Sequence, residues 1–254
     1  MASDLKGKAV LITGASTGIG AAAARAFAAH GARLAIHYNA SREAAEQVAA
    51  DVRTLGGQAL LVAGDVTESL HVKRIVAETH EALGRIDVLI NNAGGLVART
   101  RIEDYSEAFL QRVLALNVIQ VALFMHATIP IMRQQKKGNV INVSSIAARH
   151  GGGAGAIIYA GAKGFIATAT HGWAKEVVGD GIRVNAVSPG VIATPFHQRY
   201  STAEQLKAMQ ATIPMNRIGE PDECAGTFLY LASDELSGYV TGQVIEVNGG
   251  QYMP

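Results

Sequence analysis

The stretch AVLITGASTGIG at residues 9–20 joins a short apolar run to a glycine-rich turn and then to an alanine-rich segment. The run at residues 9–13 is uniformly apolar up to Thr13, as expected of a strand that is buried on both faces. The alanine-rich segment predicts a helix over residues 19–30. Glycines between a strand and a helix permit a tight turn, and the helix N-terminus presents unpaired N–H groups to an anion. The stretch therefore predicts a strand, turn and helix that can hold a pyrophosphate.

The same alternation of apolar runs and helical patterns continues along the chain. Further strands are predicted at residues 33–38, 58–63, 87–91, 140–144, 183–187 and 244–247, and helices at 41–55, 69–83, 106–135, 159–178 and after Pro221. Apolar strands that alternate with helices are typical of a parallel sheet covered on both faces. No Pro- or Ser-rich linker divides the chain. We therefore expect an α/β fold, a doubly wound parallel sheet of about seven strands, in a single domain over residues 1–254.

Composition excludes several classes of protein. The chain has 254 residues, 49% hydrophobic and 17% charged, so it can bury a large core and is not disordered. A formal net charge of +1 is too weak for a sequence-blind nucleic-acid binder, and no nucleic-acid partner is expected. The apolar stretch Val118–Met125 is far shorter than the ~18 residues of a spanning helix and contains Gln120, so no membrane is expected either.

The cysteine and histidine residues bear on the cellular compartment and on metal binding. The single cysteine, Cys224, cannot form an intrachain disulfide, which fits a reducing compartment, and the N-terminal residues lack the pattern of a signal peptide. We expect a cytoplasmic protein. His71, His80 and His171 have no partners at metal-ligand spacing, so no metal site is expected.

Small and hydrogen-bonding residues follow the third and fourth predicted strands, at Gly64-Asp65-Val66 and at residues 91–94, NNAG. Parallel strands end at one edge of a sheet, where a dinucleotide binds in folds of this kind. An acidic residue ~20 positions after the glycine loop would grip the ribose hydroxyl of NAD, but no Asp or Glu occurs from Ala32 to Arg42. Asn39, Ser41 and Arg42 can donate to a 2′-phosphate. We expect NADP, with NAD as the alternative because Thr17 leaves the glycine loop without a basic residue.

Tyr159 and Lys163 lie four residues apart, hence on one face of a predicted helix. A phenol has a reference pKa of ~10, which an adjacent cation and an oxidised nicotinamide would lower toward neutral pH. Ser144 and Ser145 end the preceding strand, and Ser145 lies 14 residues upstream of Tyr159. The three side chain types suit general acid-base chemistry on an alcohol or ketone.

These pieces together resemble the short-chain dehydrogenase/reductase family over essentially the whole chain. The matching motifs are TGxxxGIG at residues 13–20, NNAG at 91–94, Asn117 in a long helix, Ser145 with Tyr159 and Lys163, and Pro189-Gly190. The resemblance implies a Rossmann-type sheet and an NAD(P)(H)-dependent oxidoreductase that interconverts a secondary alcohol and a ketone by hydride transfer. It also implies a homotetramer. Within the family the sequence is most similar to 3-oxoacyl-carrier-protein reductases, with sugar and polyol dehydrogenases as the alternative; a non-catalytic dinucleotide sensor is a more distant one.

The resemblance also implies roles for individual residues. Tyr159 would be the acid or base, Ser145 would steady the substrate oxygen, and Lys163 would lower the tyrosine pKa and hold the nicotinamide ribose. Asn117 would hold a water on a proton path to Lys163. Ser144 is the alternative to Ser145, because the gap to Tyr159 looks about one residue longer than is usual in the family. The expected cofactor contacts are Gly14, Ser16, Thr17, Gly18, Ile19, Gly20, Asn39, Ser41, Arg42, Asp65, Val66, Asn92, Ala93, Gly94, Tyr159, Lys163, Pro189, Gly190, Ile192 and Thr194.

Substrate identity is expected to reside in residues 95–101, 147–158 and 196–215, the last of these a mobile lid. The basic residues in and beside these segments are Arg99, Arg101, Arg149, His150, His197 and Arg199. Positive residues at the rim of a cleft favour an anionic ketone or alcohol. The alternative is that these residues are exposed loop charges or contacts between subunits.

Overall fold

A seven-stranded parallel sheet, in the order β3-β2-β1-β4-β5-β6-β7, forms the centre of the computed structural model, which describes residues 2–254. The strands are β1 Ala9–Ile12, β2 Arg33–Tyr38, β3 Gln58–Ala63, β4 Val88–Asn91, β5 Gly138–Val143, β6 Ile182–Pro189 and β7 Val244–Val247. Neighbouring strands pair in parallel, for example Val10 opposite Leu34 and Val88. The predicted Rossmann-type sheet is confirmed, and each predicted strand lies within about two residues of the observed one.

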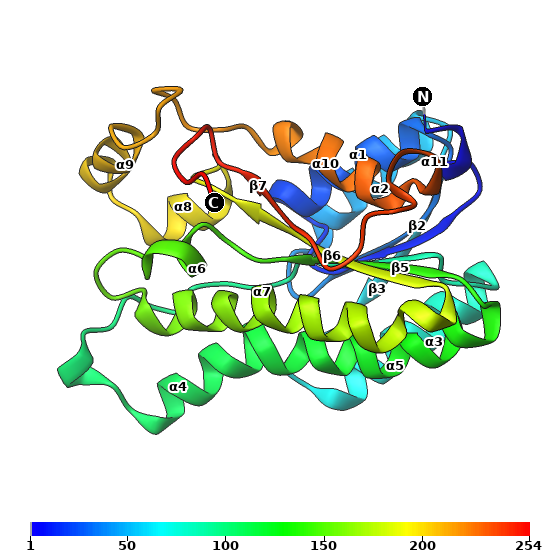
Figure 1. The fold of residues 1–254 in the computed structure, drawn as a ribbon, viewed down its shortest axis with the longest axis horizontal. Coiled ribbons are helices and arrows are strands. Elements are labelled where there is room, and N and C mark those ends of the chain that lie inside the picture. The colour runs from blue at the N-terminus through cyan, green and yellow to red at the C-terminus, as the bar shows by residue number, and fades with distance from the viewer. Residues whose placement is uncertain (1) are drawn as a thin grey trace.

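Helices cover both faces of this sheet (Figure 1). They are α1 Gly18–Ala29, α2 Arg42–Thr54, α3 Ser69–Leu83, α4 Glu107–Leu114, α5 Gln120–Gln135, α6 Ala147–His150, α7 Ile157–Val177, α8 Pro195–Tyr200, α9 Ala203–Gln210, α10 Pro221–Ala232 and α11 Asp234–Ser237. In Figure 1, α3, α5 and α7 lie below the sheet and α1, α2 and α10 above it. The short helices α8 and α9 project beyond the carboxyl ends of the strands.

The two layers of helices explain why the strands are mostly apolar. Val10 and Ile12 of β1 belong to the core cluster that contains Phe27 and Phe228, on the side of α1 and α10. Leu11, the residue between them, belongs to the cluster on the opposite face, with α3 and α5. Because successive side chains of a strand point to opposite faces, a strand covered on both sides is apolar at most positions. The buried polar side chains of β5 and β6 have hydrogen-bond partners, as Asn139, Asn142 and Asn185 show.

The predicted long helix over residues 106–135 is present but is interrupted by a π-helical turn at Ala115–Ile119. By length and composition, Glu107–Gln135 could cross a membrane. The sequence-based expectation rested only on the continuous apolar run Val118–Met125, whereas hydropathy averaged over 18 residues of this helix includes polar ones. Phe124 and Met132 of this helix pack into the core beside α3, as a core helix of a globular protein does.

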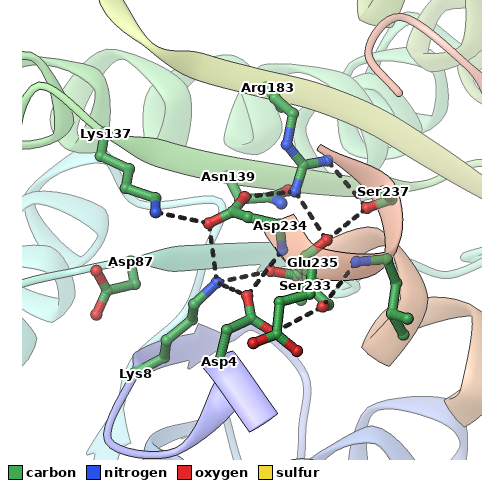
Figure 2. A network of polar contacts seen from close by, with 12 residues as sticks. Asp4, Lys8, Asp87, Lys137, Asn139, Arg183, Ser233, Asp234, Glu235 and Ser237 are labelled. Atoms are coloured by element: carbon green, nitrogen blue, oxygen red, sulfur yellow. Dashed lines mark hydrogen bonds and ion pairs between the residues drawn. The ribbon is translucent and has the colours of Figure 1, made fainter. Parts of the chain in front are cut away.

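A network of charged side chains ties the amino ends of the strands to the C-terminal part of the chain (Figure 2). Asp234, at the start of α11, accepts hydrogen bonds from Lys137 at 2.8 Å and Arg183 at 2.9 Å, and from Lys8 at 3.2 Å. Partial burial acts to raise the pKa of Asp234, but Lys137, Arg183 and Lys8 outweigh it and hold the pKa well below its usual range. Asp4 joins the network through Lys8. One carboxylate thus connects β5, β6, α11 and the segment before β1.

We expect Asp234→Asn to lower the free energy of unfolding by about 2 kcal/mol at pH 7, since it leaves three cations without their shared partner in a partly exposed site. A depressed carboxylate pKa stabilises the fold at pH values above the ordinary Asp value and ceases to do so as pH falls through the folded value. The difference between wild type and variant should therefore shrink below pH ~4. Urea unfolding over pH 3 to 7 measures both effects.

Asp180→Asn is the matched control, because Asp180 pairs with Arg133 on the surface. An exposed pair should change the free energy of unfolding by less than ~0.5 kcal/mol. Equal losses in the two variants would contradict the role given to Asp234.

Candidate active site

A cavity of about 1000 Å³ opens at the carboxyl ends of the strands. It is lined by the glycine loop, the ends of β2 to β6 and the helices α8 and α9. The predicted residues that line it are Gly14, Ser16, Thr17, Gly18, Ile19, Asn39, Ser41, Asp65, Val66, Asn92, Ala93, Gly94, Ser145, Tyr159, Lys163, Pro189, Gly190, Ile192 and Thr194. The fold therefore brings together most of the residues that the sequence selected.

The glycine loop is held against the end of β4. Gly14 has a φ of +62°, and a β-carbon there would lie 3.0 Å from the Ala93 Cα, so the position requires glycine. The Thr13 hydroxyl accepts the N–H groups of Asn92 and Ala93, each at 2.9 Å. The Asn92 amide in turn donates to the Thr13 and Gly14 carbonyls. These hydrogen bonds hold the backbone that follows β1 against the backbone that follows β4, at the mouth of the cavity.

The first helix begins at this loop without a side chain that caps it. Thr17 is the N-cap residue of α1, and its side chain makes no capping hydrogen bond. The N–H groups of the first turn, with the positive end of the helix dipole, are left to a ligand. The loop thus fits the pyrophosphate of a dinucleotide.

Three predicted site residues, Gly20, Arg42 and Asn117, do not line the cavity. A β-carbon at Gly20 would lie 2.6 Å from the Asn92 amide nitrogen, so this glycine serves the packing of α1 against β4. Arg42 points to solvent and pairs with Glu46 at 2.8 Å, one turn along α2. Arg42 and Glu46 are four residues apart on the predicted helix, so their spacing already indicated this pairing.

Asn117, the third, lies in the π-helical turn and is fully buried. Its amide donates to the Gly95 and Val113 carbonyls at 2.8 and 2.9 Å, and its Oδ1 accepts the Gly95 N–H at 3.0 Å. A β-carbon at Gly94 would lie 2.9 Å from this Oδ1 and 3.2 Å from the Lys163 Nζ. Both amide N–H groups are used, so the side chain positions the Gly94–Gly95 backbone, and the predicted water contact stays a prediction.

The geometry separates the two serines at the end of β5. Ser144 is buried, and its hydroxyl donates to the Lys163 carbonyl at 2.9 Å. Ser145 lines the cavity, accepts the Ala147 N–H at 3.1 Å and hydrogen bonds with Tyr159. Ser144 is a structural link to α7, whereas Ser145 faces the reacting groups.

Lys163 carries a buried amino group. Its Nζ donates to the Val143 carbonyl at 2.7 Å and lies 5.9 Å from the centre of the Tyr159 ring. Burial lowers the pKa of Lys163 to about 8. The lysine therefore loses its proton far more readily than an exposed one.

The pKa of Tyr159 departs from expectation. Burial raises the pKa of Tyr159 to about 12, and the hydrogen bond with Ser145 offsets only part of the rise. The phenol is thus protonated at neutral pH. The Lys163 hydrogen bond is directed to the Val143 carbonyl and not to the phenol. The lowering of the tyrosine pKa by Lys163 together with an oxidised nicotinamide therefore stays a prediction.

The predicted basic rim is only partly present. Arg99, His150, His197 and Arg199 line the cavity. Arg149 does not, since it pairs with Glu246 at 2.9 Å and stacks on Tyr252. Arg101 is exposed and pairs with Glu103.

Arg99 has a structural role as well as a place in the cavity wall. Its Nε donates to the Tyr200 carbonyl at 2.7 Å and its Nη1 to the Ala154 carbonyl at 2.8 Å. It therefore joins α8 to the loop before α7. The sequence could not predict these two hydrogen bonds of Arg99, because both acceptors are backbone carbonyls.

Sequence reasoning also missed the aromatic wall of the cavity. The ring of Phe196 packs on Tyr159, with centroids 5.7 Å apart, and on Tyr200 at 5.1 Å. Phe196 begins the segment predicted as a lid, but nothing in its sequence pairs it with Tyr159. His37, in β2, lines the cavity too and was not selected.

Comparisons with known proteins agree with this geometry. A family model described as enoyl-(acyl carrier protein) reductase matches residues 14–251. The chain is 38% identical over 253 residues to the 3-oxoacyl-[acyl-carrier-protein] reductase of Synechocystis sp., with 98% of each chain covered. A short-chain type dehydrogenase/reductase from Mycobacterium marinum has a similar structure, with a TM-score of 0.93 and 35% identity over 99% of this chain and 98% of the other. The chain belongs to the short-chain dehydrogenase/reductase family.

A further match is the NADH-dependent reductase A1-R′ complexed with NAD, at a TM-score of 0.90 and 37% identity over 100% of both chains. The present short-chain dehydrogenase/reductase is accordingly an NAD(P)-dependent oxidoreductase acting on CH–OH groups and ketones. When bound, the dinucleotide supplies the hydride or accepts it. The glycine loop, Asp65 and the β4 end are the parts of this chain that fit it. Hydrogen bonds from Thr67 outweigh partial burial and keep the pKa of Asp65 low, so Asp65 stays an acceptor.

We expect Tyr159→Phe to lower kcat by ~10² or more, because it removes only the hydroxyl that is predicted to exchange the proton. The dissociation constant of the dinucleotide and the melting temperature should stay within error of wild type. Steady-state kinetics and fluorescence titration measure these quantities. Near-native turnover would remove Tyr159 from the mechanism.

Lys163→Met should raise the free energy of unfolding by about 1 to 3 kcal/mol at pH 7 while abolishing most activity. The folded chain holds a buried cation below pH ~8, whereas the unfolded chain keeps its proton up to the ordinary lysine pKa of ~10.4. Wild type therefore gains stability as pH rises through this interval, and the advantage of the variant should shrink. Loss of the Val143 hydrogen bond subtracts about 1 kcal/mol.

The matched control is Lys175→Met, an exposed lysine on the same helix. Chemical unfolding at pH 7 and pH 9.5 compares the two variants. A Lys163→Met chain that is less stable than wild type at pH 7 would contradict the cost assigned to the buried cation.

Proposed function

We propose that this enzyme reduces ketones that carry a carboxylate or another anionic group, with NADP as its preferred dinucleotide. The charge distribution of the cavity carries the proposal. Four basic residues line its lid end: Arg99, His150, His197 and Arg199. The one acidic residue among its lining residues is Asp65, between β3 and α3. Arg199 also borders a second, smaller cavity that Asp65 and Glu68 line. A cleft with one sign of charge raises the local concentration of ligands of the opposite sign.

Arg199 is the strongest candidate for direct contact with the anion. It lies on α8, stacks on Tyr200 at 5.3 Å and has no acidic partner within hydrogen-bonding distance among residues 2–254. Arg99 is already committed to two carbonyl groups. Burial and the nearby charge of Arg99 lower the pKa of His197, so this ring serves as a neutral hydrogen-bonding group.

The catalytic groups are arranged for reduction. Tyr159 would transfer its phenolic proton to the carbonyl oxygen while Ser145 hydrogen bonds to that oxygen. A pKa of about 12 keeps the phenol protonated at neutral pH, as a proton donor requires. The phenolate left behind would lie near the Lys163 ammonium, 5.9 Å from the ring centre, which can stabilise it and return a proton.

The preference for NADP rests on the end of β2. Asn39 and Ser41 line the cavity there, and no carboxylate from β2 or α2 does. A carboxylate at this place would repel a 2′-phosphate, whereas amide and hydroxyl groups can donate to it. Since the similar reductase A1-R′ is NADH-dependent, kinetics with both dinucleotides decide the question.

We also propose a homotetramer in a reducing compartment such as the cytoplasm. Leu114, Ile119 and Phe165 are large apolar side chains that stay exposed on α4, the π-helical turn and α7. Apolar surface of this kind favours contact between subunits. Cys224 is fully buried and burial raises its thiol pKa to about 12, which suits a structural thiol. A light-scattering mass near 26.6 kDa at micromolar concentration would contradict the tetramer.

The test is a set of paired ketones, each an oxo acid and its uncharged amide of equal size, assayed with NADPH and NADH. We expect the acid to have a KM about tenfold lower than the amide at low salt, and the difference to shrink as salt screens the field. NADPH should give the larger kcat/KM. Arg199→Gln should raise the KM of the acid by about fivefold and leave that of the amide nearly unchanged.

Arg101→Gln is the control, because it removes the same charge from an exposed residue outside the cavity. Equal KM values for acid and amide in the wild type would overturn the anionic substrate and favour a neutral sugar or polyol. A larger kcat/KM with NADH would overturn the preference for NADP.

A further inference from the structure

His37 is a buried ring at the carboxyl end of β2, 2% exposed, in a strand whose other inward positions are apolar. Strand β2 lies between β1 and β3 in the sheet. A side chain at this point can therefore reach the loops that leave both neighbouring strands. The ring also borders the cavity at its dinucleotide end.

Two hydrogen bonds fix the state of this ring. The Gly14 N–H donates to Nδ1 at 3.0 Å, and Nε2 lies 2.9 Å from the Gly64 carbonyl oxygen. A backbone N–H can only donate and a carbonyl can only accept, so the ring must be neutral, with its hydrogen on Nε2. Burial lowers the pKa of His37, against smaller opposing effects of Gly64 and Asp65, and so favours the same neutral form.

The two partners begin the loops that fit the dinucleotide. Gly14 starts the glycine loop, and Gly64 directly precedes Asp65 and Val66. Each loop also has one backbone bond to β2: Ala15 N–H donates to the His37 carbonyl, and Gly64 N–H to the Tyr38 carbonyl. The imidazole adds a second connection to each loop and joins the two to each other.

We propose that His37 is a positioning residue of the dinucleotide site: its neutral imidazole holds the Gly14 loop and the Gly64 loop at the separation that the adenosine end of the cofactor requires. Pre-organised loops bind more tightly because less order has to be imposed on binding. The effect is confined to the cofactor, since the ring contacts neither Tyr159 nor the lid. Phe124, which packs edge-on against the ring, helps to hold its orientation.

Three variants test the two hydrogen bonds of His37 separately and together. In His37→Asn the side chain oxygen can replace Nδ1 as acceptor for Gly14, but nothing reaches Gly64. In His37→Gln the longer amide can donate to Gly64 and the Gly14 bond is lost. His37→Phe keeps the ring volume and loses both bonds. The dissociation constants of NADH and NADPH are measured by fluorescence titration, and the KM of the ketone and kcat at saturating cofactor by steady-state kinetics.

We expect His37→Phe to weaken binding of both dinucleotides by about tenfold, with the ketone KM and the saturated kcat within about twofold of wild type. His37→Asn and His37→Gln should fall between wild type and His37→Phe. Thr79→Val is the control for general destabilisation, since it removes a buried hydroxyl bonded to the Ile75 carbonyl on α3, outside the cavity. It should leave cofactor binding unchanged.

A dissociation constant within twofold of wild type in His37→Phe would overturn the proposal. So would a loss of kcat and a rise in ketone KM as large as the loss of cofactor affinity, because both would point to general disorder of the site. If His37→Phe does not fold, the Asn and Gln variants decide: weaker binding in both supports the proposal, and wild-type binding in both overturns it.

Discussion

The hydrogen bond from the Lys163 ammonium to the Val143 carbonyl is the interaction on which the active site depends. It is buried and is matched by a second bond in the opposite direction, from the Ser144 hydroxyl to the Lys163 carbonyl. The two bonds fasten one turn of α7 to the end of β5. Tyr159 lies one turn earlier on α7, and Ser145 directly follows Ser144, just beyond the end of β5. A shift of the helix would thus move the acid and the oxygen-binding group apart.

This arrangement keeps the site residues in place but lowers the free energy of unfolding, because it buries a charged lysine. A lysine whose pKa falls to about 8 is held in surroundings that disfavour its charge. The tyrosine beside it is held in the protonated state by the same burial. Both shifts arise because burial removes the two groups from water, and both vanish in an exposed site.

The sheet and its order of elements could be predicted from the sequence, because strands buried on both faces are short and mostly apolar and seldom resemble helices. The π-helical turn at Ala115–Ile119 could not, since one extra residue in a helical turn barely disturbs an apolar pattern. The short helices α8 and α9 lack the repeated apolar positions on which such predictions rely. Their place over the cavity depends on contacts such as Phe196 with Tyr159.

Predicted site residues line the cavity where a motif and its backbone coincide, as in the glycine loop. A predicted residue lies outside the cavity where its side chain has another partner. Arg149 looked like a rim residue until its bond to Glu246, nearly a hundred residues away, was known. His37 gave only the signal of a histidine in an apolar strand. Its partners are a backbone N–H and a backbone carbonyl, which no residue pattern displays.

The ionic network around Asp234 lies at the amino ends of the strands (Figure 2), whereas the cavity lies at their carboxyl ends. Substitutions at such separated places combine nearly additively in their effect on free energy. During evolution, substitutions at the amino ends of the strands can therefore change thermal stability while substitutions at the carboxyl ends change substrate specificity. Directed evolution can use the same separation. Substitutions that stabilise the network around Asp234 would first raise the free energy of unfolding, and destabilising substitutions in the lid could then be accepted.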